Sequence, residues 1–359
     1  MPDDVGTTLT SHVRPRGDNA MTPAPRSRVR STRTGRAPLS SLGIPFGLSG
    51  LAGTWTMAAH TSLTPNIIAE GMWMLAAAAW IVVVTNYLRR SGYHGGSIGE
   101  DLRDPVQGPF ASLAPTSALL VCTHYAQYFP LAGRIATGVF MVIGLLFGTW
   151  FLAQFALRER SIDSIHGGYL LPTVAAAFII GQGAGTFGWT LLGEAAIAVG
   201  ILFWLMLGTI ILARMAFRPA PPDALLPTFA IWSAPPAVAG NAWFAVNGGR
   251  VDLVETMLLG AFVVLILVQL MMLGTYWRLP FTLGFWAFTF TAASSGTYTA
   301  HWLALWGGPG HAVWAWLATG VATMLIGSIA VRSVALLSGR TGKPSWADPK
   351  PGESGPCSP

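Results

Sequence analysis

Nine long windows of this sequence contain no charged residue, and they constrain the fold more than any other feature. Each is 18 to 53 residues long, and they cover residues 37–69, 71–88, 105–133, 135–157, 164–193, 195–213, 224–249, 256–277 and 279–331. A helix needs roughly 20 predominantly apolar residues to cross a bilayer. Eight windows hold one such helix, and the ninth holds two because a Gly-Gly-Pro-Gly run at residues 307–310 interrupts it. The windows therefore predict ten membrane-spanning helices.

Composition excludes a soluble enzyme. Only 10% of the 359 residues are charged, whereas 52% are hydrophobic; an ordinary soluble domain carries about 25% charged residues. The backbone must satisfy its own hydrogen bonds in lipid, and the apolar windows lack the alternation of barrel strands. We therefore expect an all-α polytopic membrane protein.

Lysine and arginine predict the orientation. If the N-terminus is cytoplasmic and the helices alternate, 19 of the 21 basic residues fall on the cytoplasmic side, and only Arg134 and Arg250 fall outside. The positive-inside rule then places both termini in the cytoplasm, with the protein in the cytoplasmic (inner) membrane. The same distribution explains the net charge of +6 without a nucleic-acid partner.

The two ends of the chain lack an apolar pattern. Residues 1–40 are rich in Arg, Pro, Ser, Thr and Gly, and we expect a disordered cytoplasmic tail that touches anionic lipid. Residues 339–359 are expected to form a second such tail. The transmembrane domain is therefore predicted over residues 41–338.

Prolines and small residues concentrate on the odd-numbered predicted helices. Pro45, Pro115, Pro172 and Pro235 lie on the first, third, fifth and seventh of these helices. Proline inside a helix removes a hydrogen bond and bends the helix, which suits a helix that lines a cavity better than one that faces lipid. The pattern favours five kinked inner helices and five outer helices, arranged as five hairpins. The alternative is that small residues merely permit close helix packing.

The spans are nearly free of ionisable residues, which would be the usual functional candidates inside a membrane. Glu194 is the one carboxylate expected near a span, either at the interface or in a proton-coupled role. The histidines fall in tails, loops and helix ends, so we expect no metal, no cofactor and no catalytic site.

The absence of carboxylates is permissive for an anion. Hydroxyl groups, amide and indole N–H groups and helix dipoles can solvate an anion weakly, and weak sites suit passage. Arg134 and Arg250 would draw anions to the outer mouth, or would be ordinary solvated loop charges.

Five stretches resemble one known family, the tellurite-resistance/dicarboxylate transporter family of the voltage-dependent anion channel superfamily, which includes malic acid transporters and slow-type anion channels. The likeness covers roughly residues 42–336. It is carried by Gly43-Ile44-Pro45-Phe46-Gly47-Leu48, Asp104-Pro105-Val106 with Pro115, Leu171-Pro172-Thr173-Val174-Ala175, Ala234-Pro235 with Val246-Asn247-Gly248-Gly249, and Phe285-Trp286-Ala287-Phe288-Thr289-Phe290.

The resemblance implies a fold and a gate. The family's ten helices form five hairpins about a quasi-five-fold central pore, and its members are typically homotrimers. A phenylalanine of the ninth helix crosses the pore, and the matching residue here is Phe290. Trp286 and Ser294 share its helix face. Without the resemblance, Phe290 would be read as a packing residue in an aromatic-rich helix.

The sequence is compared with three possible functions of the protein. The leading hypothesis is an anion channel or transporter for C4-dicarboxylates, tellurite, sulfite, halide or nitrate, with Phe290 as the gate. The second is a proton-coupled dicarboxylate (malate) carrier, which would use Glu194. The third, a membrane enzyme or cofactor binder, has no supporting residues.

Overall fold

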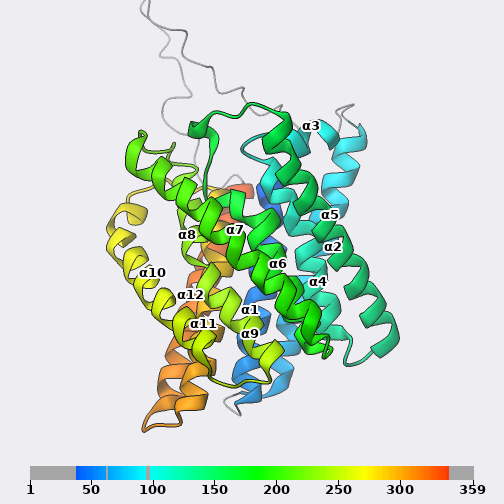
Figure 1. Ribbon diagram of the computed structural model, residues 1–359, viewed down its shortest axis with the longest axis vertical. Coiled ribbons are helices and arrows are strands. Elements are labelled where there is room, and N and C mark those ends of the chain that lie inside the picture. The colour runs from blue at the N-terminus through cyan, green and yellow to red at the C-terminus, as the bar shows by residue number, and fades with distance from the viewer. Residues whose placement is uncertain (1–37, 62–63, 94–97, 339–359) are drawn as a thin grey trace, which may run out of the picture. The chain divides into compact units, whose positions relative to one another are not determined.

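The computed structural model describes residues 38–61, 64–93 and 98–338, and within these ranges it contains helices and no strands (Figure 1). Of the predicted tails over 1–40 and 339–359, residues 1–37 and 339–359 lie outside the described residues, and the 3₁₀ helix that begins at Leu39 includes the end of the first. Five long helices alternate along the chain with five other helical segments. The long ones are α2 (Asn66–Tyr93), α5 (Pro130–Leu157), α7 (Thr190–Phe217), α10 (Leu253–Trp277) and α12 (His311–Leu337), here called the outer helices.

The alternating five, here called the inner helices, are α1 (Gly43–His60), α4 (Leu113–Tyr125), α6 (Ala176–Thr186), α9 (Pro235–Asn247) and α11 (Ala287–Trp306). Each inner helix packs against the outer helix that follows it in the chain. The inner helices also contact one another in a closed cycle, in the order α1, α4, α6, α9, α11 and back to α1. The structure thus joins five consecutive helical pairs through their first members.

Each inner helix is preceded by a short, irregular helical segment. These are the 3₁₀ helices η1 (Leu39–Leu42), η2 (Gly108–Ser112), η4 (Gly167–Leu170), η6 (Leu226–Thr228) and η7 (Leu283–Trp286), with a π-helical turn η5 (Leu171–Ala175) before α6 and a short helix α8 (Phe229–Ser233) before α9. Only α3 (Ile98–Arg103) and η3 (Ile162–Ser164) lie outside this scheme among the described elements. The irregular segments contact one another in the same cyclic order.

The predicted prolines lie where the geometry changes. Pro45 and Pro115 are the third residues of α1 and α4, Pro235 is the first of α9, and Pro172 lies in the π-helical turn η5. A proline in the first helical turn sacrifices no intrahelical hydrogen bond, because the first N–H groups have no partner there. The irregular geometry is therefore beside or before each proline.

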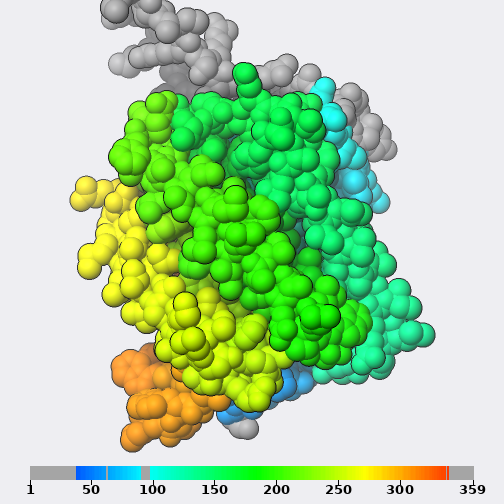
Figure 2. Space-filling model, viewed as in Figure 1, coloured from blue at the N-terminus to red at the C-terminus, as the bar shows by residue number. Residues whose placement is uncertain are grey.

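Six helical segments of the described chain are long and apolar enough to cross a membrane: the five outer helices and Gly167–Thr186. The outer helices are only 17 to 33% buried over their most apolar stretch, whereas Gly167–Thr186 is 89% buried. Helices α5, α7 and α10 form much of the surface that Figure 2 shows. Leucine, valine and methionine side chains are among the exposed residues of these helices. In water this would be a costly apolar surface, so these side chains face lipid. The predicted number of ten spans stays a prediction.

Glycine permits the close approach of inner helices. A Cβ atom on Gly47 of α1 would collide with Thr289 of α11, and one on Gly185 of α6 would collide with the backbone of Ala245 of α9. Interfaces within a bilayer gain from such close contact because lipid offers no competing hydrophobic drive.

Candidate functional site

Two cavities lie among the inner helices, one narrow and one wide. The narrow cavity has a volume of about 40 Å³, and the wide cavity about 690 Å³. The narrow cavity is bounded by residues of the irregular segments and of the adjoining first turns of the inner helices. The wide cavity is bounded by the later turns of those helices and by the start of α5.

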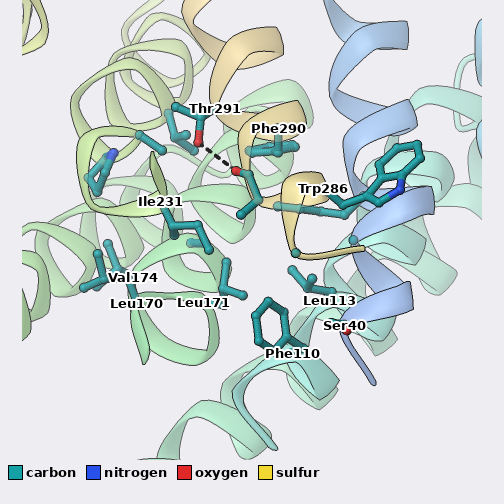
Figure 3. Close-up of a pocket in the computed structure, with 18 of the residues that line it drawn as sticks. Ser40, Phe110, Leu113, Leu170, Leu171, Val174, Ile231, Trp286, Phe290 and Thr291 are labelled. Carbon is teal, nitrogen blue, oxygen red and sulfur yellow. Dashed lines mark hydrogen bonds between the residues drawn. The ribbon is translucent and has the colours of Figure 1, made fainter. Parts of the chain in front are cut away.

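The narrow cavity is almost entirely apolar. Figure 3 shows Phe110 and Leu113 near one end, Phe290 and Thr291 near the other, and Leu170, Leu171, Val174 and Ile231 along the side. The Thr291 hydroxyl hydrogen-bonds to two backbone carbonyl oxygens, those of Ala230 and Ala287, at 3.3 Å each. No charged residue lines this cavity within the described chain. An ion there would exchange its water for hydrocarbon, which is unfavourable.

Phe290 lines both cavities, and so does Val238 of α9. The Phe290 ring stacks on Phe46 of α1, with ring centroids 3.7 Å apart and planes 15° apart. Gly50 lies beside the ring edge, where an added Cβ would be 2.8 Å from Phe290 Cδ2. The Phe290 ring is therefore part of the boundary between the narrow and wide cavities, held by one aromatic face and one glycine.

The wide cavity carries basic and polar side chains. Those with nitrogen donors are His60, Trp73, His124, Gln127, Arg134, Gln182, Asn241 and His301, and hydroxyl groups come from Ser49, Thr56, Thr123, Thr186, Ser294 and Thr297. No aspartate or glutamate is among the described residues that line it. The cavity is therefore electrostatically favourable to an anion and unfavourable to a cation.

Glu70 lies beside the wide cavity, and each of its carboxylate oxygens has a hydrogen-bonding partner. Glu70 of α2 contacts His124 Nε2 through Oε2 at 3.1 Å and accepts a hydrogen bond from the Tyr128 hydroxyl at 2.7 Å. The His124 ring also stacks on Trp73, with centroids 4.4 Å apart. The carboxylate raises the pKa of the exposed Tyr128 hydroxyl by accepting its hydrogen bond.

His166 connects the segments that precede α4 and α6, beside the narrow cavity. Its Nδ1 accepts a hydrogen bond from the Gly168 N–H at 3.1 Å, which leaves the proton on Nε2 to be donated to the Val106 carbonyl at 3.1 Å. Its ring also stacks on Phe110, a residue of the narrow cavity. Burial lowers the pKa of His166 to about 4, because a second proton would leave the charged ring without solvent and would remove the acceptor at Nδ1.

Asp163, close to His166 in the sequence, forms a surface ion pair with Arg218. Arg218 donates two hydrogen bonds to the Asp163 carboxylate, at 2.8 and 2.6 Å. The guanidinium lowers the pKa of Asp163 by this hydrogen bonding. Both side chains are exposed, so the pair contributes little to stability.

The predicted site residues divide between the two cavities. Trp286 and Pro235 line the narrow cavity, Ser294 lines the wide one, and Phe290 lines both. Pro45, Pro115 and Pro172 are buried in the inner segments and line neither cavity.

The two predicted outer arginines differ. Arg134 lines the wide cavity, with its guanidinium 5.6 Å from the centroid of the Phe187 ring. Arg250 lies outside both linings, and its Nε donates to the Asn247 carbonyl at 3.0 Å. Glu194 is exposed on α7 and also lies outside both linings.

Sequence reasoning missed a buried acid. Glu255 of α10 is 0% exposed, and its Oε2 accepts a hydrogen bond from the Tyr298 hydroxyl of α11 at 2.8 Å. The charge-free window 256–277 begins directly after this residue, so the window pattern leaves Glu255 outside the predicted span. A usable signal was present in Asp252, which caps the N-terminus of α10 through the Glu255 N–H and therefore places Glu255 inside the helix.

Sequence reasoning also gave no role to the histidines at the ends of the predicted helices. His60, His124 and His301 belong to three different inner helices, and the structure brings all three to the wide cavity. No sequence spacing connects them, because they meet only through the cyclic packing of α1, α4 and α11.

Apolar outward helices, inner helices that enclose two cavities and a polar lining with no acid among its described residues define a membrane protein of the transport class. The sequence matches the voltage-dependent anion channel family over residues 36–337, and the chain belongs to that family. The family consists of channels and transporters rather than enzymes.

Two relatives illustrate the range of the family. The chain is 24% identical over 260 residues to the tellurite resistance protein TehA homolog of Haemophilus influenzae, an alignment that covers 72% of this chain and 78% of the relative. It is 22% identical over 285 residues to the S-type anion channel SLAH3 of Arabidopsis thaliana, which covers 74% of this chain and 42% of that protein.

Proposed function

We propose that the protein is a passive anion pathway of the cytoplasmic membrane in which Phe290 is the gate. The observation that carries the proposal is that Phe290 lines both cavities, one large and polar and the other small and apolar. The two cavities and the gate would form one pore through the cycle of inner helices. Ten spans, both termini in the cytoplasm and a homotrimer with one pore per subunit complete the proposed arrangement.

The lining supports an anion as the substrate. Neither cavity has an acid among its described residues, whereas the wide one has Arg134 and three histidines. We propose small inorganic or dicarboxylate anions as the substrate class: C4-dicarboxylates, tellurite, sulfite, halide or nitrate. Pro45, Pro115, Pro172 and Pro235 would shape the inner helices, while Trp286 and Ser294 would lie along the path on either side of the gate.

The lining does not favour the proton-coupled carrier that would depend on a carboxylate. That carrier would use Glu194 as the titratable group in the path. Glu194 is exposed on α7, and Glu255 is turned toward Tyr298; neither contributes to a cavity lining. The predicted proton-coupled role of Glu194 is tested separately. The measurement is whether Glu194→Gln changes the dependence of malate flux on a pH gradient.

Planar-bilayer recording tests the proposal. Wild-type protein and Phe290→Ala are compared in a salt gradient, with sodium malate, sodium nitrate and sodium chloride in turn. We expect a reversal potential set by the anion and a current roughly tenfold larger in Phe290→Ala, because removing an apolar constriction removes the barrier to a hydrated ion.

Phe288→Ala is the matched control, since Phe288 lies on the same helix, packs on Tyr276 and lines neither cavity. A cation-selective current in the wild type would contradict the anion pathway. An unchanged current in folded Phe290→Ala would contradict the gate alone.

A further inference from the structure

We propose that the wide cavity contains a binding site for a carboxylate or oxyanion, formed by Arg134, Gln182 and His301, where the anion is held before it reaches Phe290. This inference deepens the proposed anion pathway and rests on it. It assigns a ligand chemistry to side chains that the gate itself does not use.

The three side chains have free hydrogen-bonding capacity. Within the described chain, the Arg134 guanidinium has no ion pair and no hydrogen bond, and it lies over the Phe187 ring. The side chain of Gln182 makes no hydrogen bond to a described residue; only its backbone carbonyl is used, by Thr186. The His301 ring stacks on Phe244 at 4.0 Å and likewise has no hydrogen-bond partner there. Their N–H groups are available to a ligand.

Aromatic contacts orient two of these groups without consuming their donors. Arg134 is positioned by Phe187, which directly follows α6, the helix that carries Gln182. His301 is positioned by Phe244 of α9. Packing against an aromatic ring restricts each side chain without using its N–H groups, so less rotational entropy is lost when a ligand binds.

Neighbouring acids do not compete for these donors. Glu70 is engaged by His124 and Tyr128, and Asp252 accepts hydrogen bonds from Trp243 at 2.8 Å and from the Glu255 N–H at 3.0 Å. Glu255 is engaged by Tyr298. None of these three lines the wide cavity. The positive charge of Arg134 is therefore left for an anion that enters from solvent.

The chemistry of the donors selects among anions. Guanidinium presents paired N–H groups that match two oxygens of a carboxylate or oxyanion, an arrangement that a halide cannot use. The cavity of about 690 Å³ has room for a C4-dicarboxylate together with water. We therefore expect malate and tellurite to bind more tightly than chloride.

Titration calorimetry on the detergent-purified full-length protein tests the site at neutral pH. Malate is titrated into wild type, Arg134→Gln, His301→Gln and Arg250→Gln. We expect roughly tenfold weaker binding in Arg134→Gln, because a charge-assisted bond is lost, and a smaller loss in His301→Gln. Arg250→Gln is the matched control, since Arg250 lies outside the cavity, and it should bind as the wild type does.

Wild-type affinity in folded Arg134→Gln, or no malate binding to the wild type, overturns the site. Tighter binding of chloride than of malate overturns its oxyanion preference. Gel filtration and thermal melting of each variant exclude misfolding as the cause of a loss.

Failure of the site and failure of the pathway give different results. If malate binds and Arg134→Gln weakens it while bilayers carry no anion current, the site stands and the pathway fails. If Phe290→Ala carries malate current whose half-saturating concentration is unchanged by Arg134→Gln, the pathway stands and the site fails.

Discussion

The narrow cavity and the wide cavity are enclosed by the same five inner helices but differ in size, polarity and local backbone geometry. Irregular 3₁₀ and π segments surround the narrow cavity and bring Phe110 and Trp286 inward. Regular α-helix surrounds the wide cavity, where Gly53 has open space beside it. An anion keeps its water or finds N–H donors in the wide cavity and loses both in the narrow one. The difference locates the expected barrier at Phe290, where the two meet.

The sharpest way to break this comparison is to rebuild the boundary from α9, the inner helix next to α11. Val238→Phe in a Phe290→Ala background places a ring at the other residue shared by the cavities. We expect bilayer current to fall roughly tenfold from that of Phe290→Ala, because an apolar constriction is restored. Val264→Phe, on the exposed face of α10, is the control and should leave the current high. Equal currents in the two double variants would mean that the barrier lies elsewhere.

A smaller effect is expected from the residue that supports the ring. Phe46→Ala removes the stacking partner of Phe290 from the narrow side and leaves Phe290 in place. An aromatic pair contributes roughly 0.5–1.5 kcal/mol beyond its buried area, so we expect a current increase of a few-fold. The measurement is single-channel open probability. An increase as large as that of Phe290→Ala would make Phe46 an equal part of the gate.

A fall in pH should lower the unfolding free energy of the protein through His166, which lies beside the narrow cavity. Its folded-state pKa of about 4 lies below the ordinary value of 6.5, so the unfolded chain takes up a proton first as the pH falls. The stabilisation is complete above about pH 6.5 and is lost progressively between 6.5 and 4, a total on the order of 3 kcal/mol.

Thermal melting of purified protein across that range measures this loss. In His166→Gln the dependence over the same range should flatten, whereas His60→Gln, at an exposed position, should melt with the wild-type dependence. A wild-type slope in His166→Gln would show that other groups account for the acid sensitivity.

The last prediction concerns the contact between α10 and α11, outside both cavity linings. Tyr298→Phe removes the hydrogen bond that the Tyr298 hydroxyl donates to the carboxylate of buried Glu255, and we expect a loss of about 1–3 kcal/mol in unfolding free energy. Tyr128→Phe removes an exposed hydrogen bond to Glu70 and should cost much less. Denaturant titration compares them. Adding Glu255→Leu to Tyr298→Phe should recover stability, since no unpaired polar group remains; failure to recover would assign the loss to packing.

Much of the fold could be predicted from the sequence because membrane insertion depends on local composition. Charge-free windows predicted an all-helical membrane protein, and the Gly-Pro run at 307–310 separates α11 from α12 as expected. The alternation of small-residue and aliphatic helices corresponds to the inner and outer sets. The same charge pattern gives no indication that Glu255 is buried, because a charge count does not reveal that Tyr298 hydrogen-bonds to its carboxylate.

The sequence by itself determined which segments are helices and which of them are rich in proline and small residues, since these follow from hydropathy and backbone chemistry within one segment. Only the tertiary structure decided that His60, His124, Arg134 and His301 share a cavity and that Arg250 does not. It also decided that Phe290 lies between a wide and a narrow space. These residues come from helices far apart in the chain, and their proximity depends on how five helices pack in a cycle, which no local pattern specifies.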